Sequence, residues 1–185
     1  GKGVPAALIM AEVRASTQLL ASTRVELESL FQRLNLLVHQ STDKKNFVTF
    51  FAAEINTSKR SMSYVNAGHP PPIIYSNKEV RSLAKGTIPL GLFTSLPKLV
   101  THSEEFLPGS IFVAYTDGIV ERTNLQEEQY GDERLLEFIR THAYLDVQPF
   151  TESLLEEVKN FGQGKDLDDD VTLAVAKYSA GSNEK

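Results

Sequence analysis

The chain has 185 residues, with 24 acidic and 19 basic side chains, a formal net charge of −5 and no cysteine. The acidic balance argues against a nucleic-acid partner, because binding to a phosphate backbone needs a basic face. The absence of cysteine excludes a disulfide scaffold, a thiol nucleophile and a zinc–thiolate site, and it is typical of a cytoplasmic protein. No apolar run approaches the roughly 20 residues that span a bilayer, so we expect no membrane contact by this domain.

Two helices are predicted at the start of the chain. The first covers residues 4–22, where Pro5 occupies the first turn, a position that tolerates the missing N–H group. The second covers residues 23–40, and its apolar side chains recur at helical spacing. Thr23, with Glu26 three residues later, matches the pattern of a capping box and is predicted to begin this second helix.

The pattern then changes to short apolar or alternating stretches separated by turn residues, which predict strands. The first four are interpreted as one antiparallel meander and two more as a further hairpin: 46–56, 61–68, 71–76 and 79–85, then 98–106 with 111–116. Two late helices, a closing strand and a polar tail are predicted at 131–143, 147–162, 168–178 and 179–185. Helices segregated from antiparallel strands indicate an α+β fold, with the helices on the outer faces of the sheets.

Acidic side chains stand at the tips of two predicted strands. Asp117 follows the strand 111–116, and the run "DLDDD" at 166–170 directly precedes the closing strand. If these strands are antiparallel neighbours, Asp117 lies beside an aspartate of that run, and two carboxylates at about 4 Å repel by about 1 to 4 kcal/mol. A hard divalent cation such as Mg²⁺ or Mn²⁺ offsets this repulsion. The plainer alternatives are an ordinary Asp-Gly turn and a solvated acidic loop.

Five motifs occur in one order along the chain. They are "GKGVPAALIMA", "FVTFFAAEIN" with "YVNAGHPPPIIY", "GTIPLGLF", "IFVAYTDGIVERTN" with "YGDERL", and "DDDVTLAVAKY". In this order the chain resembles the bacterial PP2C-type (PPM) serine/threonine phosphatases of the SpoIIE/RsbU group. The resemblance covers residues 1–178, which we therefore expect to form one phosphatase domain, with 179–185 as a polar tail.

The resemblance implies a β-sandwich of antiparallel sheets flanked by helices, in the order α-β-β-α, with a binuclear Mn²⁺ or Mg²⁺ centre. It implies metal-assisted hydrolysis of phosphoserine or phosphothreonine on a protein. The usual substrate in this group is a phosphorylated anti-anti-sigma (STAS-domain) protein, and its dephosphorylation releases a partner switch. Asp117 matches the metal-binding aspartate of the family's "TDG" motif, and Asp169 matches that of its "DD-hydrophobic-Thr" motif, with Asp170 as the neighbour that could be confused with it.

The family pattern also places metal-binding aspartates immediately before "GKG" and in an earlier strand. Both stretches precede Gly1, so the first strands and about half of the expected ligand set lie outside residues 1–185. We assign the phosphatase activity to the intact domain and expect a chain that starts at Gly1 to be inactive and to hold at most one ion, weakly. The competing hypothesis is a catalytically inactive PP2C-like module that serves protein binding or dimerisation, and a homodimer is compatible with either.

Several other polar residues invite a role in the site. His69 precedes three prolines and could be a general acid, but a role in stabilising the turn is the simpler interpretation, and Asn66 is interpreted in the same way. Gly91 belongs to a predicted tight loop that borders the site in the family. Arg24 and Lys2 could meet a phosphate, although solvated surface is the preferred interpretation for both.

Overall fold

The structure, a computed structural model, describes residues 3–41, 46–167 and 169–179. Two units can be distinguished in the chain. Unit 1 comprises Gly1–His69 and Lys85–Glu105, and unit 2 comprises Pro70–Ala84 and Phe106–Lys185. The chain therefore passes between the units three times, and each unit joins segments that are distant in the sequence.

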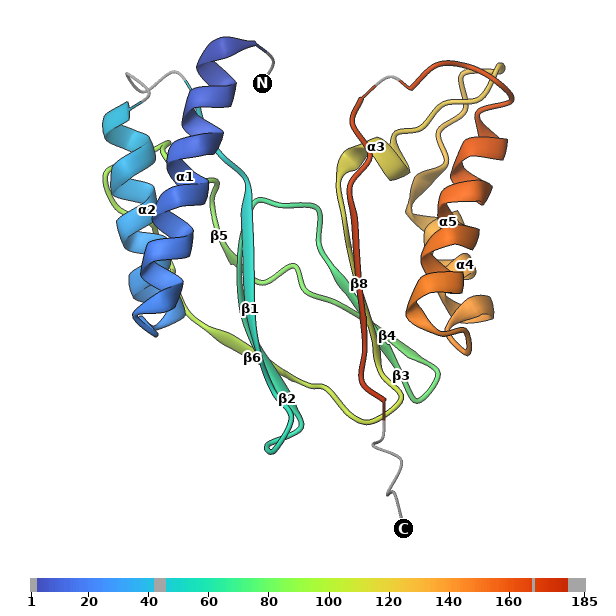
Figure 1. Cartoon of the computed structure of the whole chain (residues 1–185), viewed down its shortest axis with the longest axis horizontal. Helices are drawn as coiled ribbons and strands as arrows, with labels where there is room; N and C mark the ends of the chain where they lie inside the picture. The colour runs from blue at the N-terminus through green and yellow to red at the C-terminus, as the bar shows by residue number, and fades with distance from the viewer. Residues whose placement is uncertain (1–2, 42–45, 168, 180–185) are drawn as a thin grey trace. The chain divides into compact units, whose positions relative to one another are not determined.

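Unit 1 combines two helices with a four-stranded sheet (Figure 1). Its elements are α1 (Val4–Ser22), α2 (Leu27–Ser41), β1 (Phe50–Asn56), β2 (Ser61–Ala67), β5 (Gly86–Thr87) and β6 (His102–Glu105). Strand β2 is central, because it pairs antiparallel with β1 along its whole length and with β6 over its first residues. Strand β5 joins the end of β2 in parallel.

The core of unit 1 forms between α2 and the sheet. The apolar stripe predicted for the second helix lies there, together with the buried Val65 and Ala67 of β2. Of its six residues, Leu37 is partly buried and the other five are buried: Leu27, Leu30, Phe31, Leu34 and Val38. Helix α1 contributes little to this core, since Val13 is its buried residue among those described. The spacing of three and four residues along α2 explains why one face of that helix packs against the sheet.

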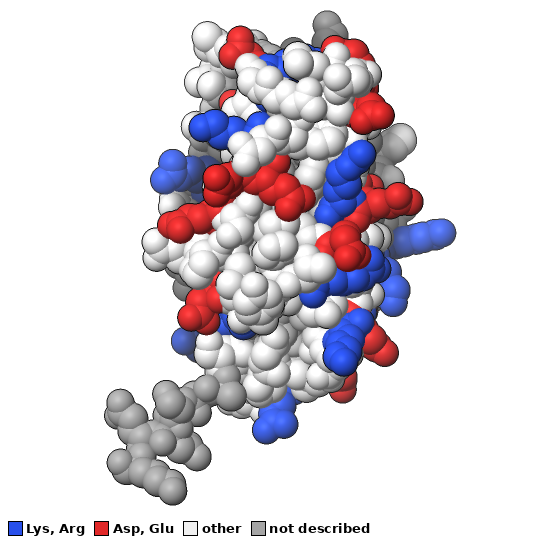
Figure 2. Space-filling view, turned by 90° about the vertical axis from the view of Figure 1, so that its right-hand side faces the viewer, with Lys and Arg blue, Asp and Glu red and all other residues white. Residues whose placement is uncertain are grey.

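Unit 2 also combines a four-stranded sheet with helices. Its strands are β3 (Ile73–Ser76), β4 (Glu79–Ser82), β7 (Ile111–Tyr115) and β8 (Leu173–Lys177), in the sheet order β4-β3-β7-β8 with every pair antiparallel. Its helices are the single turn α3 (Asp117–Val120), α4 (Gly131–His142) and α5 (Val147–Phe161). Figure 2 shows the side on which α4 and α5 lie in Figure 1, and acidic and basic side chains are interspersed over it.

The core of unit 2 lies between its sheet and the pair α4 and α5. Alternate residues of β7 are buried, Ile111, Val113 and Tyr115, as a strand with one face toward a core requires. They pack with the buried faces of the two helices, of which Phe138 and Phe150 meet edge to face at 5.4 Å between ring centroids. The body of β7 is therefore held firmly, and one residue, Thr116, separates its end at Tyr115 from Asp117.

The predicted class, α+β with antiparallel sheets and flanking helices, is confirmed. The predicted helices 4–22, 131–143 and 147–162 agree with α1, α4 and α5 to within one residue at each end. Residues 180–185 of the predicted polar tail lie outside the described residues. None of the helices within the described ranges is both long and apolar enough to cross a membrane.

Two predicted strand connections are wrong. Strands β2 and β3 belong to different sheets, so the meander is two separate hairpins, β1 with β2 and β3 with β4. Prolines occupy positions 70–72 between them, and proline has no N–H group for a strand ladder. The predicted hairpin of 98–106 with 111–116 also fails, because β6 pairs with β2 while β7 pairs with β3. The N–H group of Gly109 in the intervening turn instead donates to the carbonyl of Tyr178, at 2.7 Å.

The capping box predicted at Thr23 is also wrong. Thr23 follows the last residue of α1, and its hydroxyl donates to the carbonyl of Leu20 at 2.8 Å, so it closes the first helix instead of opening the second. The next residue, Arg24, has a positive φ of 52°, which reverses the chain before α2 begins at Leu27. In a short connection between two helices, such a threonine can cap the end of the first helix or the start of the second. Here Thr23 caps the end of the first helix, α1.

Candidate functional site

The end of β7 is bonded to the chain that leads into β8. Tyr115 pairs with Leu173 in the antiparallel ladder, and beyond it the Thr116 N–H group donates to the carbonyl of Thr172 at 3.1 Å. The Thr116 hydroxyl donates to the carbonyl of Asp170 at 3.2 Å and accepts from the Thr172 N–H group at 2.9 Å. The prediction that these two strands are antiparallel neighbours is therefore confirmed. Hydrogen bonds between the two segments continue beyond the ladder, as far as Asp170.

Asp117 and Asp169 stand on these two adjoining segments, and both are exposed. Asp117 is the first residue of α3, and its carboxylate accepts the N–H group of Gly118 at 3.1 Å. The Asp169 carboxylate accepts the N–H group of Asp170 at 2.9 Å. The segment after β7 is thus a helical turn and not the Asp-Gly turn of the plainer alternative.

Gly118 has a reason to be glycine that the sequence did not reveal. A Cβ atom at this position would lie 2.5 Å from the carbonyl oxygen of Asp170, which is closer than real Cβ atoms come to non-bonded heavy atoms. Glycine at this position therefore lets the backbone of α3 approach the backbone that precedes β8.

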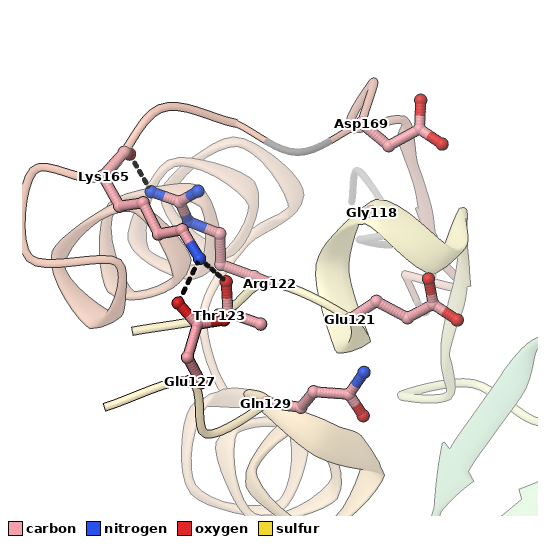
Figure 3. A pocket seen from close by; sticks show the side chains of 8 residues that line it. All are labelled: Gly118, Glu121, Arg122, Thr123, Glu127, Gln129, Lys165 and Asp169. Atoms are coloured by element: carbon pink, nitrogen blue, oxygen red, sulfur yellow. Dashed lines mark hydrogen bonds and ion pairs between the residues drawn. The ribbon is translucent and has the colours of Figure 1, made fainter. Parts of the chain in front are cut away.

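A pocket of about 260 Å³ opens beside this junction in unit 2 (Figure 3). It is lined by Gly118, Glu121, Arg122, Thr123, Glu127, Gln129, Lys165 and Asp169. Figure 3 shows the Asp169 and Glu121 carboxylates directed to the same side, away from the cluster of Arg122, Thr123 and Lys165. The pocket therefore has an acidic side, which carries Asp169, and a side that is rich in hydrogen-bond donors.

The donor side of the pocket ties the loop between α5 and β8 to the segment after α3. The Arg122 guanidinium donates to the carbonyls of Lys165 and Asp166. The Lys165 ammonium donates to the Thr123 hydroxyl at 2.6 Å and pairs with the Glu127 carboxylate at 3.1 Å. Both cations were missed at the sequence level, because an arginine in "ERTN" and a lysine between glycine and aspartate are ordinary surface patterns.

The strand that leads to Asp117 ends in a buried tyrosine. Tyr115 is 4% exposed, and its hydroxyl donates to the Asp132 carboxylate at 3.3 Å. Burial, and then the Asp132 charge, raise the pKa of the Tyr115 hydroxyl above its ordinary value of about 10, so the hydroxyl is protonated at neutral pH and stays so in mild alkali. The neutral hydroxyl therefore remains a donor, and it links the end of β7 to α4.

The other residues that the sequence singled out lie elsewhere in the chain. The Asn66 side chain donates to the His69 carbonyl at 3.0 Å and accepts its N–H group at 2.8 Å, which supports the interpretation of this stretch as a stabilised turn. The Gly91 N–H group is bonded to the Asn35 side chain in unit 1. Arg24 is exposed beside α1. Lys2 and Asp168 lie outside the described residues.

The ligand chemistry at the junction of β7 and β8 fits a hard divalent cation in kind. Asp117 and Asp169 offer carboxylate oxygens on adjoining segments, and the chain has no thiol that would favour a softer metal. Within residues 3–41, 46–167 and 169–179, however, no three histidine, aspartate or glutamate side chains are grouped as metal ligands. The described part of the chain thus provides a pair of candidate ligands and not a complete coordination shell.

Comparison with known proteins gives one matching family and a consistent set of relatives. The family described as Stage II sporulation protein E (SpoIIE) matches residues 1–179. The phosphoserine phosphatase RsbU of Bacillus subtilis is 30% identical over 183 residues, which is 96% of this chain and 52% of RsbU. The chain therefore spans about half the length of that relative.

Solved structures show the same fold at low sequence identity. The SiaA-PP2C domain of Pseudomonas aeruginosa superposes with a TM-score of 0.81 over 97% of this chain and 72% of its own length, at 16% identity. RsbX in complex with magnesium superposes with a TM-score of 0.65 over 95% of this chain and 75% of its own length, at 22% identity. The chain belongs to the SpoIIE family and has the fold of PP2C phosphatase domains.

Proposed function

We propose that the chain is the catalytic domain of a metal-dependent protein serine/threonine phosphatase, with residues 1–178 as the domain. The observation that carries this proposal is the junction of β7 with β8, at which Asp117 and Asp169 stand on segments bonded to each other. The similarity to RsbU, which is named a phosphoserine phosphatase, supports the choice of reaction. The proposed substrate is a protein that carries phosphoserine or phosphothreonine.

We assign Asp117 and Asp169 as catalytic residues because they would hold the metal ion, with Mn²⁺ or Mg²⁺ as the ion. A divalent ion at these carboxylates supplies Lewis-acid chemistry for phosphoryl transfer. RsbX, which shares the fold, has been solved in complex with magnesium, and this supports the class of ion. The contribution of this chain is geometric, since the buried body of β7 and the bonds of Thr116 hold together the two backbone segments that carry these carboxylates. Both side chains are exposed, so a phosphorylated side chain can reach them.

The more specific part of the proposal is the partner. Membership of the SpoIIE family, together with the similarity to RsbU, supports a phosphorylated STAS-type anti-anti-sigma regulator as the substrate, within a partner switch that controls a sigma factor. The mixed charge on the face shown in Figure 2 fits a protein substrate better than a polyanion.

The competing function is a catalytically inactive module for protein binding or dimerisation. The described residues provide two carboxylates at the junction without a third ligand grouped beside them. A protein that binds a phosphorylated regulator without hydrolysing it needs no complete metal shell. Only the phosphatase releases inorganic phosphate from the regulator.

Phosphate release from a phosphoserine-bearing STAS-domain protein separates these functions. The full-length protein is incubated with this substrate in Mn²⁺, in Mg²⁺ and in EDTA, and a phosphotyrosine peptide serves as the control substrate. We expect phosphate release in Mn²⁺ or Mg²⁺, none in EDTA, and none from phosphotyrosine. Binding of the phosphorylated regulator without release in any divalent ion would contradict the proposal and establish the inactive module.

A further inference from the structure

We propose that Arg122 is a positioning residue, which fixes the loop between α5 and β8 and thereby holds Asp169 next to the segment of Asp117. The proposal rests on the function proposed above, in which Asp169 is a metal ligand. In this role Arg122 acts through the loop and not by contact with the substrate or the ion. Its role is to set where the backbone before Asp169 lies.

The position of Arg122 shows which segment it holds. The residue is 4% exposed, and its guanidinium donates through both terminal nitrogens to the carbonyls of Lys165 and Asp166. These carbonyls lie four and three residues before Asp169. A guanidinium is a rigid planar fork, so two bonds from it to successive carbonyls fix the orientation of the backbone as well as its distance.

The space around the guanidinium is shaped for it. Gly162 has a φ of −69°, a conformation open to any residue, so its backbone does not require glycine. A Cβ atom at Gly162 would overlap the Arg122 guanidinium, which is the nearest group to it. The glycine therefore leaves room for the arginine at the point where α5 ends and the loop begins.

A second cation closes the same junction from the opposite direction. Lys165, whose carbonyl accepts from Arg122, donates its ammonium to Thr123 at 2.6 Å and Glu127 at 3.1 Å (Figure 3). Arg122, on the segment after α3, thus bonds the loop before β8, and Lys165, on that loop, bonds the segment after α3. The segment that begins with Asp117 and the loop that ends at Asp169 are joined at both of these points.

Stability alone does not account for an arginine at this place. A buried cation is costly, and the Arg122 Nε atom is buried without a hydrogen-bond partner in the described part of the chain. A well-packed apolar side chain of similar length would fill the space without this cost. What an apolar side chain cannot do is bond two successive carbonyls and so define the path of the loop.

The variant Arg122→Lys tests this role, because it keeps the charge and removes the fork. We expect the amides of residues 165–171 to exchange hydrogen about tenfold faster in the full-length protein, and the Mn²⁺ concentration at half-maximal binding to rise by about tenfold. The turnover at saturating Mn²⁺ should stay within about threefold of the wild type, because excess metal compensates for a loosely held ligand. Isothermal titration and hydrogen-exchange mass spectrometry provide two readouts that do not depend on hydrolysis.

Arg134→Lys is the matched control. Arg134 also donates to two carbonyls, those of Gln129 and Tyr130, and its guanidinium lies 4.9 Å from the Phe161 ring centroid, but it is exposed and bonds no residue of the loop. This control should leave Mn²⁺ binding and the exchange of residues 165–171 unchanged. If Arg122→Lys does not fold, Gly162→Ala tests the same contact by displacing the guanidinium, and it should show the same two shifts.

A lower melting temperature in Arg122→Lys, with unchanged exchange in the loop and unchanged Mn²⁺ binding, would overturn the proposal. Failure of the proposed function has a different signature, namely wild-type protein that releases no phosphate in any divalent ion. In that case, faster exchange of the loop in Arg122→Lys still supports the positioning role, and unchanged exchange still contradicts it.

Discussion

Each unit of the molecule contains a buried polar side chain that holds a loop, and the two differ in charge. In unit 1, Asn35 is 1% exposed, donates to the carbonyls of Phe93 and Thr94, and accepts the N–H group of Gly91. In unit 2, Arg122 bonds only carbonyls of its loop and leaves Nε unpaired among the described residues. A neutral amide is therefore sufficient to hold a loop in this fold.

The comparison separates stability from function. The Asn35 amide uses both its NH₂ group and its oxygen in hydrogen bonds to the loop. It holds the loop without the desolvation cost of a buried charge. Arg122 carries the cost of a buried cation, and the loop that it holds leads to a proposed metal ligand. We therefore expect changes around Asn35 to alter stability alone, and changes around Arg122 to alter metal binding as well.

Asn35→Leu should produce the largest loss of stability. It leaves the Gly91 N–H group and the Phe93 and Thr94 carbonyls without their partner, and we expect the free energy of unfolding to fall by about 3 kcal/mol. Urea denaturation measures this change. Phosphate release per folded molecule should remain within about threefold of the wild type, and a larger fall would mean that the unit 1 loop also serves the site.

A pair of glycine substitutions sharpens the comparison. Gly91→Ala places a side chain at a φ of +95° and a Cβ atom 2.6 Å from a methyl group of Val38, and it should cost about 2 kcal/mol of stability without changing Mn²⁺ binding. Gly118→Ala should cost a similar amount and also weaken Mn²⁺ binding by about tenfold, since its Cβ atom would push the Asp170 backbone away. Calorimetric unfolding measures the loss of stability in both variants, and metal titration measures their Mn²⁺ binding. Equal Mn²⁺ binding in the two variants would mean that the junction serves stability and not metal binding.

Much of unit 2 could be predicted from the sequence, because its signals are local. Helices α4 and α5 were predicted to within one residue at each end, and the acidic tips of two apolar strands indicated the junction of β7 with β8. The predicted meander was wrong because strand pairing depends on the sheet to which each strand belongs. The residues of a short strand do not indicate its sheet. Arg122 was missed because its partners are backbone carbonyls, which have no sequence signature.

Tyr130→Phe should produce the smallest effect. The Tyr130 hydroxyl is buried and donates to the Glu157 carboxylate at 2.5 Å, and its loss should cost about 1 kcal/mol of stability. Burial, and then this bond to Glu157, raise the pKa of Tyr130, so the contribution is present at neutral pH and declines above the unfolded pKa of about 10. Denaturation of the wild type and of Tyr130→Phe at neutral pH and above pH 10 measures how their difference in unfolding free energy changes with pH. A difference that grows with pH would contradict this prediction.

The central claim is that Asp117 and Asp169 act together as metal ligands for phosphate-ester hydrolysis. The direct measurement is Mn²⁺-dependent phosphate release, with metal in excess, by full-length Asp117→Asn and Asp169→Asn. Asp170→Asn checks the register of the motif, and Asp146→Asn removes an equivalent exposed charge before α5. We predict a loss of about a hundredfold or more for the first two at an unchanged melting temperature, a smaller loss for Asp170→Asn and none for Asp146→Asn. Full activity in Asp117→Asn or Asp169→Asn would contradict the claim.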